Sequence, residues 1–229
     1  MGATIEFASN GDTARGYLAR PPSGTGPGVV VIQEWWGLND QIRRVCDRFA
    51  DAGFVALAPD LYGGREVRIG EPDEAAKAMM SMKMDQAARD LSGTVDELGR
   101  QAAGDRVGVI GFCMGGGLAL VLACQRPDAV AAVVPCYGVI PWPEAQPDYS
   151  AMSAAVLIHC AERDASFPPE TAVELADRLS ALGREVEVVI HPGVDHAFFN
   201  EDRPEVYDEA EAAELWASSV AFFLNHLGP

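Results

Sequence analysis

Residues 106–125 read RVGVIGFCMGGGLALVLACQ, and this stretch decides the fold. Its β-branched beginning predicts a buried strand over residues 106–111. Its almost wholly apolar end predicts a helix over residues 116–125. Cys113 lies between them, with a glycine two positions before it and another two positions after it, the pattern of a sharp strand-to-helix turn that presents a nucleophile. The stretch therefore predicts a cysteine held at the point of a tight turn, at the carboxyl end of a strand.

The rest of the chain repeats this alternation of strand and helix. Strands are predicted over residues 28–33, 54–58, 129–136, 154–160 and 185–191, and helices over residues 40–52, 73–99, 171–182 and 205–227. Ahead of them, Asn10-Gly11 predicts the tight turn of a hairpin. Such alternation predicts an α/β fold, a mostly parallel sheet with helices on both faces. No linker or repeat divides the chain, so residues 1–229 are interpreted as a single domain.

The composition excludes several classes of partner. Thirty-four Asp and Glu residues against seventeen Lys and Arg residues give a net charge of −17, so nucleic acid and anionic membrane surfaces are not expected as partners. No apolar run approaches the ~18 residues of a membrane span, and the first residues lack the pattern of a signal peptide. Five cysteines without CxxC spacing predict neither a disulfide framework nor a zinc site. We therefore expect a cytoplasmic protein.

The turn around Cys113 has the features that activate a thiol. Its side chain is expected to project above the sheet edge, at the N-terminus of the following helix, where the helix dipole favours a thiolate. The next backbone N–H group, that of Met114, can face a developing oxyanion. A free cysteine is more often a small buried residue, and that interpretation is kept for the cysteines at positions 46, 124, 136 and 160. Cys113 is interpreted as a nucleophile.

A cysteine nucleophile needs a base, and histidine is the usual one. His196 lies in a loop between the last predicted strand and the last predicted helix, on the sheet edge where Cys113 projects. His159 falls inside a strand and is interpreted as a core residue. His191 ends a strand, and His226 belongs to the last helix. We therefore assign the base to His196.

The third member of the site is expected to be an acid that orients the imidazole. Asp164 follows the strand over residues 154–160, which gives the chain order nucleophile, acid, histidine that α/β-hydrolases have. Glu162, in the same loop, is the alternative. Asp195 is adjacent to His196, but its side chain is expected to point away from that of its neighbour.

A further group of candidates follows the strand over residues 28–33. The carboxylate of Glu34 can hydrogen-bond the resting thiol, although a solvated turn residue is an equal alternative on the sequence alone. The backbone N–H groups of Trp35 and Met114 form the expected oxyanion hole. Tryptophans such as Trp35 and Trp36 more often serve packing than chemistry.

Five segments together resemble the dienelactone hydrolase family. They are Gln-Glu-Trp-Trp-Gly-Leu-Asn at 33–39, Ala-Pro-Asp-Leu-Tyr-Gly at 58–63, Gly-Phe-Cys-Met-Gly-Gly at 111–116, Arg163-Asp164, and Asp195-His196-Ala197-Phe198. The resemblance covers the chain from about residue 10 to residue 227. It implies a single-domain α/β-hydrolase fold.

The resemblance also implies a chemistry. By motif match the catalytic triad is Cys113, Asp164 and His196, and Glu34 holds the cysteine at rest and takes its proton as substrate enters. The implied reaction is hydrolysis of a small-molecule ester or lactone, with no metal and no organic cofactor. The residues expected to line the substrate pocket are Trp36, Tyr137, Phe198 and Asn200. The expected assembly is a monomer or a small homo-oligomer.

One departure from the family concerns the substrate. Members specific for dienelactone hold its carboxylate with two arginines, one of them four residues after the catalytic histidine. Here that position is Asn200, and the place of the other arginine falls near Pro72. An amide does not replace bidentate recognition of a carboxylate by arginine. Nearby arginines that could substitute are Arg65, Arg68 and Arg203. The acidic residues concentrated over 200–214 also disfavour an anionic substrate, so we expect broader or different specificity.

Other functions remain open on the sequence. Among hydrolases, a broad-specificity esterase or thioesterase that does not use dienelactone is the alternative. A non-catalytic homologue that binds a ligand would keep the fold and lack a reactive thiol. A peroxide-sensing thiol is a third alternative, although no second cysteine has resolving spacing near Cys113.

Overall fold

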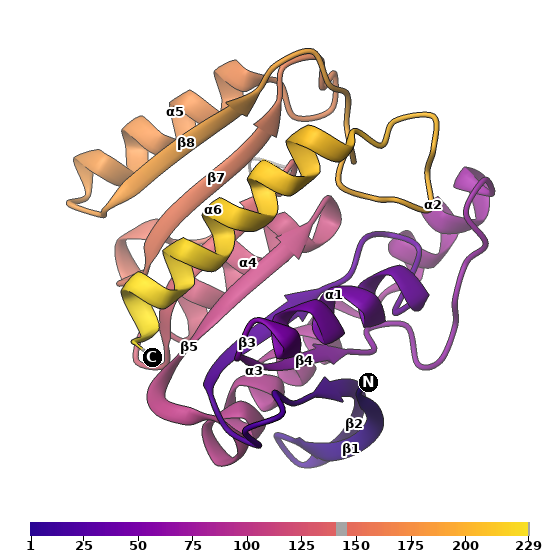
Figure 1. The fold of residues 1–229 in the computed structure, drawn as a ribbon, viewed down its shortest axis with the longest axis vertical. Coiled ribbons are helices and arrows are strands. Elements are labelled where there is room, and N and C mark those ends of the chain that lie inside the picture. Colours follow the sequence, from indigo (N-terminus) through magenta and orange to yellow (C-terminus); the bar gives the residue numbers. More distant parts are fainter. Residues whose placement is uncertain (141–145, 229) are drawn as a thin grey trace.

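A computed structural model describes residues 1–140 and 146–228, and within them eight strands form one sheet in the order β1-β2-β4-β3-β5-β6-β7-β8. The strands are β1 Ala3–Ser9, β2 Asp12–Ala19, β3 Pro27–Ile32, β4 Val55–Pro59, β5 Ala103–Phe112, β6 Val130–Cys136, β7 Ala155–Ala161 and β8 Val186–His191. The predicted hairpin is β1 and β2, which pair antiparallel, while the sheet from β4 to β8 is parallel (Figure 1). The predicted mostly parallel α/β fold is confirmed.

The strand order determines where a site can form. After β3 the chain moves outward to β4, whereas from β5 onward it moves in the opposite direction across the sheet. β3 and β5 are neighbours at this reversal, with Ile32 opposite Gly111. At such a switch point the loops that leave the two strands diverge and open a crevice at the carboxyl edge of the sheet. Glu34 follows β3 and Cys113 follows β5, so both lie at this crevice.

Helices cover both faces of the sheet because strand side chains alternate between two apolar cores. The helices that pack on the sheet are α1 Asp40–Asp51 and α6 Glu209–Leu227 on one face, and α3 Met84–Gln101, α4 Met114–Gln125 and α5 Pro169–Ala181 on the other (Figure 1). Along β3, Val29 and Val31 enter the core under α1 and α6, while Val30 and Ile32 enter the other core. Among the helices of the described residues, none has the length and apolar composition that crossing a membrane requires.

The prediction of one continuous helix over residues 73–99 is wrong, because the segment forms two helices. They are α2 Pro72–Ser81 and α3 Met84–Gln101, and the two residues between them are extended, with ψ of 129° and 102°. No glycine or proline marks the break. The cause is tertiary packing: α3 lies on the main core, whereas α2 packs beside Trp36 in a small separate cluster.

Three other helices begin at positions different from those predicted, and one of them, α5, begins at Pro169, two residues before the predicted start. The last helix begins at Glu209 rather than at residue 205, because the side chain of Asp208 accepts hydrogen bonds from the N–H groups of Ala210 and Glu211 and caps the helix there. α4 begins at Met114, two residues earlier than the apolar pattern indicated. Its N-terminus therefore lies directly at the predicted nucleophile.

A buried polar cluster lies between β7, β8 and α6. Nδ1 of His159 and Nε2 of His191 are 2.9 Å apart, Nδ1 of His191 lies 2.8 Å from a carboxylate oxygen of Glu211, and Nε2 of His159 lies 3.3 Å from Oγ of Ser219. Burial, reinforced by repulsion from His191, lowers the pKa of His159 to about 3. His159 is therefore a neutral core residue, as predicted.

We expect His159 to make the protein less stable in acid. The unfolded chain protonates this side chain near its ordinary pKa of 6.5, whereas the folded protein does so only at a pKa of about 3. Between these values the unfolded state binds more protons than the folded state. The free energy of unfolding therefore falls as the pH is lowered from 6.5 towards 3, by about 4 kcal/mol at the acid end. Urea denaturation at about pH 7, 5.5 and 4.5 measures this slope.

The variant His159→Gln isolates the contribution of this residue, because glutamine keeps hydrogen-bonding atoms but does not titrate. Its free energy of unfolding is expected to fall less steeply over the same pH range. The matched control is His226→Gln, near the end of α6 and outside the buried polar cluster, and it is expected to keep the wild-type slope. Identical slopes in the wild type and in His159→Gln would contradict the prediction.

Candidate active site

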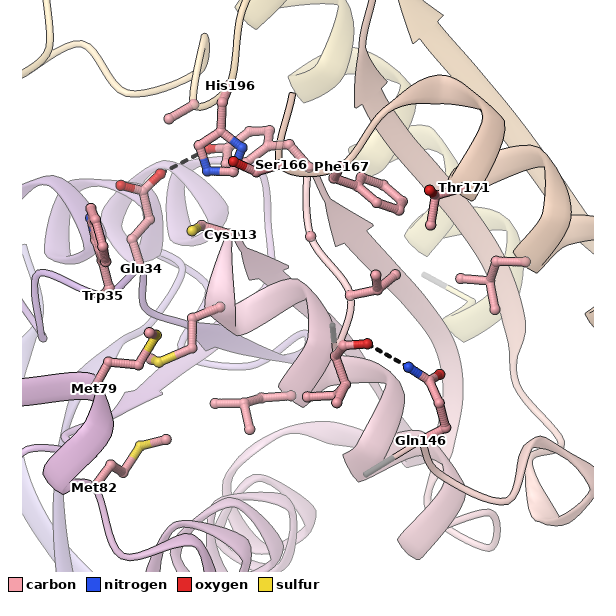
Figure 2. Close-up of a pocket in the computed structure, with 18 of the residues that line it drawn as sticks. Glu34, Trp35, Met79, Met82, Cys113, Gln146, Ser166, Phe167, Thr171 and His196 are labelled. Atoms are coloured by element: carbon pink, nitrogen blue, oxygen red, sulfur yellow. Dashed lines mark hydrogen bonds between the residues drawn. The ribbon is translucent and has the colours of Figure 1, made fainter. Parts of the chain in front are cut away.

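The turn after β5 holds Cys113 in a strained backbone conformation. Its φ of 55° and ψ of −118° lie in a region that residues with a side chain rarely occupy. Two backbone hydrogen bonds hold it there, from the N–H of Cys113 to the carbonyl of Cys136 at 3.0 Å and from the N–H of Gly116 to the carbonyl of Cys113 at 2.9 Å. The thiol thereby lies at the N-terminus of α4 and borders a cavity (Figure 2).

The turn requires glycine at three positions where backbone segments touch. A Cβ atom on Gly111 would lie 1.9 Å from the carbonyl oxygen of Gly115, and one on Gly115 would lie 2.5 Å from that of Ile32. These two glycines belong to the motif that predicted the turn. The third is Gly138, after β6, where a Cβ atom would lie 1.9 Å from the carbonyl oxygen of Cys113. No motif in the sequence marks Gly138.

His196 and Asp164 form a close pair beside the thiol. Nδ1 of His196 lies 2.6 Å from one carboxylate oxygen of Asp164, whose side chain is buried. The other oxygen accepts hydrogen bonds from the backbone N–H groups of Ser166 and Phe167, at 2.7 and 2.9 Å. These bonds fix the carboxylate, which holds Nδ1 and leaves Nε2 of His196 free on the cavity that Cys113 also lines.

The two other candidate acids lie away from the imidazole. The carboxylate of Glu162 accepts a hydrogen bond from the backbone N–H of Gly193 at 2.7 Å. Asp195 is exposed. Within the described part of the chain, Asp164 is the carboxylate bonded to His196.

The surroundings of His196 favour its protonated form. Burial alone would lower the pKa, but hydrogen bonds to Asp164 and Cys113 and the negative charge of these partners raise it to about 10. The imidazole is therefore charged at neutral pH. This positive charge borders the cavity that Cys113 also lines.

Glu34 lies close to the thiol in the same view (Figure 2). It is buried, and its two carboxylate oxygens accept hydrogen bonds from the Tyr137 hydroxyl at 3.1 Å and from the Asn200 amide at 2.9 Å. Burial raises the pKa of Glu34, while the bonds from Asn200 and Tyr137 and the positive charge of His196 oppose that rise. Glu34 is therefore a held, buried carboxylate and not a solvated turn residue.

The two backbone N–H groups predicted as oxyanion donors belong to Trp35 and Met114, and both residues line the cavity with Cys113. In the part of the chain that the structure describes, neither group donates to a backbone acceptor. Both are thus available to a ligand.

The cavity over the thiol has a volume of about 740 Å³, which is ample for a small organic molecule. Its walls come from the junction of α2 and α3, the first turns of α4, the segment after β6, and α5. Four of the lining side chains, here called the methionine wall, come from the α2–α3 junction: Met79, Met80, Met82 and Met84. The sequence predicted a continuous helix here and gave no sign that these methionines face the thiol.

The predicted pocket residues fall into two groups. Tyr137 lines the cavity, whereas Trp36, Phe198 and Asn200 are not among the lining side chains of the described residues. Trp36 is buried beside α2, and Phe198 is buried against the rings of Tyr137 and His191, with centroids 5.7 and 4.6 Å apart. Asn200 is buried behind the cavity, where it donates to the carboxylate of the adjacent lining residue. These three side chains therefore support the wall of the cavity from behind.

The candidate arginines do not reproduce a pair of carboxylate-binding groups. Arg203 lines the cavity, but its Nε lies 2.9 Å from the carboxylate of Glu205. Arg65 pairs with Glu74 at 3.1 Å outside the cavity lining, and Arg68 is not among the lining residues either. In the described residues, no group of three or more His, Cys, Asp or Glu side chains is arranged to hold a metal ion.

Comparison with known proteins gives a consistent picture. Residues 14–227 match the model of the dienelactone hydrolase family. Over 99% of this chain and 100% of each relative, the chain is 40% identical to "Protein usf" of Aquifex pyrophilus and 37% identical to a protein of Aquifex aeolicus named "Putative carboxymethylenebutenolidase". A crystal structure from Klebsiella pneumoniae, described as a "Putative Dienelactone Hydrolase", superposes with a TM-score of 0.84 at 29% identity, covering 99% of this chain and 100% of that one.

We expect Gly138→Ala to destabilise the protein, because the new methyl group meets the carbonyl of the strained residue Cys113. The atoms that would have to move are backbone atoms of the turn, so the cost is expected to be about 2 kcal/mol or more. The free energy of unfolding from urea denaturation measures it. The matched control is Gly99→Ala, in α3, where a Cβ atom meets nothing within 4 Å.

The control is expected to be neutral or to stabilise the helix by about 0.5–1 kcal/mol. Equal stability of Gly138→Ala and Gly99→Ala would contradict the importance of this close approach.

Proposed function

The chain belongs to the dienelactone hydrolase family, whose members are hydrolases, and from this premise we propose that it hydrolyses carboxylic esters or lactones through a thioester on Cys113. One observation carries the proposal. A thiol on a strained strand-to-helix turn borders the same cavity as His196, and His196 is hydrogen-bonded to Asp164. These are the parts that covalent catalysis by a thiolate requires.

Acylation begins once Cys113 has lost its proton and is a thiolate beside the imidazolium of His196. The Cys113 thiolate attacks the carbonyl carbon, a C–S bond forms, and the carbonyl oxygen becomes an oxyanion that accepts from the N–H groups of Trp35 and Met114. Collapse of this intermediate breaks the C–O bond to the leaving alcohol. The imidazolium of His196, with its pKa raised by Asp164 and the thiolate, donates its proton to the departing alkoxide.

Deacylation reverses these roles. His196, now neutral, takes a proton from water, and the hydroxide attacks the thioester carbonyl. Loss of the C–S bond releases the acid and returns the thiolate to Cys113, beside the imidazolium. Asp164 holds the ring in one orientation throughout.

Glu34 is proposed to exchange a proton with the thiol as substrate enters. Burial raises its pKa, which makes the carboxylate a better proton acceptor than one in water. The bonds from Tyr137 and Asn200 hold it at the edge of the cavity, near Cys113. The side-chain amide of Asn200 donates to the Glu34 carboxylate, so this amide is not available to a carboxylate on the substrate. Specificity for the anionic dienelactone is therefore not part of the proposal.

The first test is whether Cys113 is both the reactive thiol and the residue needed for turnover. Burial raises the pKa of the Cys124 and Cys160 thiols to about 11 and that of Cys46 and Cys136 further. Iodoacetamide at neutral pH is therefore expected to modify Cys113 first, with loss of p-nitrophenyl acetate hydrolysis in proportion. Cys113→Ala is expected to lose turnover by about 10³-fold or more while keeping its fold.

Cys124→Ala serves as the matched control, because this cysteine is buried at the opposite end of α4, and it should retain both turnover and thiol labelling. Full activity of purified Cys113→Ala would end the proposal. A folded wild type with no fast-labelling thiol and no turnover would instead favour a non-catalytic homologue.

Asp164→Asn tests the assignment of the acid. Removing the charge takes away the main support for the raised pKa of His196, so less imidazolium is present at neutral pH and the ring loses its fixed orientation. We expect kcat/KM for p-nitrophenyl acetate to fall by about 10²–10⁴-fold. The control is Glu162→Gln, which changes the alternative acid in the same loop and is expected to stay within about threefold of the wild type. The reverse order of effects would assign the acid to Glu162.

A further inference from the structure

The cavity beside Cys113 is long in one direction. α4 begins directly after the thiol, and both Met114 and Leu118, one helical turn apart, line the cavity. On α5 the lining residues recur at the same helical spacing from Thr171 to Arg178. At 1.5 Å per residue this stretch of α5 covers on the order of 10 Å. The cavity is therefore a groove that extends from the thiol between α4 and α5.

The walls of this groove are apolar, and its charged residues lie at the two ends. Glu34 and Arg203 stand at the end near the thiol, where each already has partners. Glu174 and Arg178 are exposed at the far end, and the Arg178 guanidinium lies over the ring of Tyr149, 4.7 Å from its centroid. Between these ends the lining includes the methionine wall, Leu118 and Leu175. A carboxylate in this middle part would lose its water without gaining a positively charged partner.

The geometry around the thiol indicates which part of a substrate enters the groove. In Figure 2, Cys113 lies between His196 on one side and Met79 and Met82 on the other. The leaving alcohol must be near His196, because it takes its proton from the imidazolium. The acyl group stays on sulfur and extends away from the imidazole, along the methionine side.

We propose that the substrate is an uncharged ester or thioester with a flexible, extended apolar acyl chain, which lies between the methionine wall and the facing sides of α4 and α5. This inference rests on the proposed function, since it assigns the acyl side of that same site. Methionine is unbranched and adaptable, so a wall of methionines suits chains of varying length and shape. A small, rigid lactone with a carboxylate would leave most of the groove unused.

The test is a series of p-nitrophenyl esters from acetate through butyrate and hexanoate to decanoate. Each added methylene that enters the groove is expected to raise kcat/KM by about fourfold, until the chain reaches the far end and the gain stops. A series that is flat or falls from acetate onward overturns the inference, while turnover of acetate leaves the proposed function standing.

The variant Met79→Glu/Met82→Glu places charge on the wall. The ratio of kcat/KM for octanoate to that for acetate is expected to fall by about tenfold or more relative to the wild type. The matched control is Leu224→Glu, which makes the same kind of change at an exposed position on α6 outside the cavity lining, and it should keep the wild-type ratio. An unchanged ratio in the double variant overturns the assignment of the wall.

A second pair of substrates tests charge at constant length. Ethyl butyrate and monoethyl succinate both have four carbons in the acyl group. Their hydrolysis is measured by the protons that it releases. We expect ethyl butyrate to be preferred by about tenfold or more, because the succinate carboxylate would be buried among the methionines. Preference for monoethyl succinate overturns the inference and assigns Arg203 or Arg178 to an anionic substrate. Failure of every ester with a folded protein overturns the proposed function itself.

Discussion

The close backbone approach around Cys113 is the constraint on which the rest of the site depends. The carbonyl of this residue is pressed against Gly138, and its N–H is bonded to the carbonyl of Cys136, so the turn is held by the strand beside it. Three glycines make that contact possible, and the strained φ of 55° is its result. Because β6 holds the turn, the thiol, the start of α4 and the ring of Tyr137 form one rigid unit. The strain is stored in a scaffold that is buried on both faces of the sheet.

The polar groups of the site each have defined hydrogen-bond partners. Asp164 is fixed by two backbone N–H groups and bonds His196, and Glu34 is fixed by two side chains. Each carboxylate is buried and satisfied, which is how charge is tolerated in an apolar surrounding. The imidazolium stands between them, so the region around the thiol is preorganised for the charges of the proposed thioester chemistry.

The sequence predicted the parts of the fold that depend on local pattern. The alternating strands and helices, the hairpin at Asn10-Gly11 and the turn at Cys113 all follow from short stretches and were found. The break between α2 and α3 was missed, because it is imposed by packing against Trp36 and leaves no glycine or proline behind. The requirement for glycine at position 138 was missed for the same reason, because it comes from the close approach of the Cys113 carbonyl, which belongs to another segment. Contacts between segments distant along the chain cannot be derived from local pattern.

The small cluster under α2 has a consequence for how this protein can change over time. Trp36, Val67, Ala75 and Ala78 form a cluster separate from the two main cores, and the buried side chains of α2 belong to this cluster. Substitutions in α2 therefore alter the shape of the groove without disturbing the sheet that carries the chemistry. Substitutions in α2 can in this way change which substrates fit the groove while the proposed reaction stays the same. The two extended residues between α2 and α3 thus mark the boundary between a helix that shapes the groove and a helix that packs on the main core.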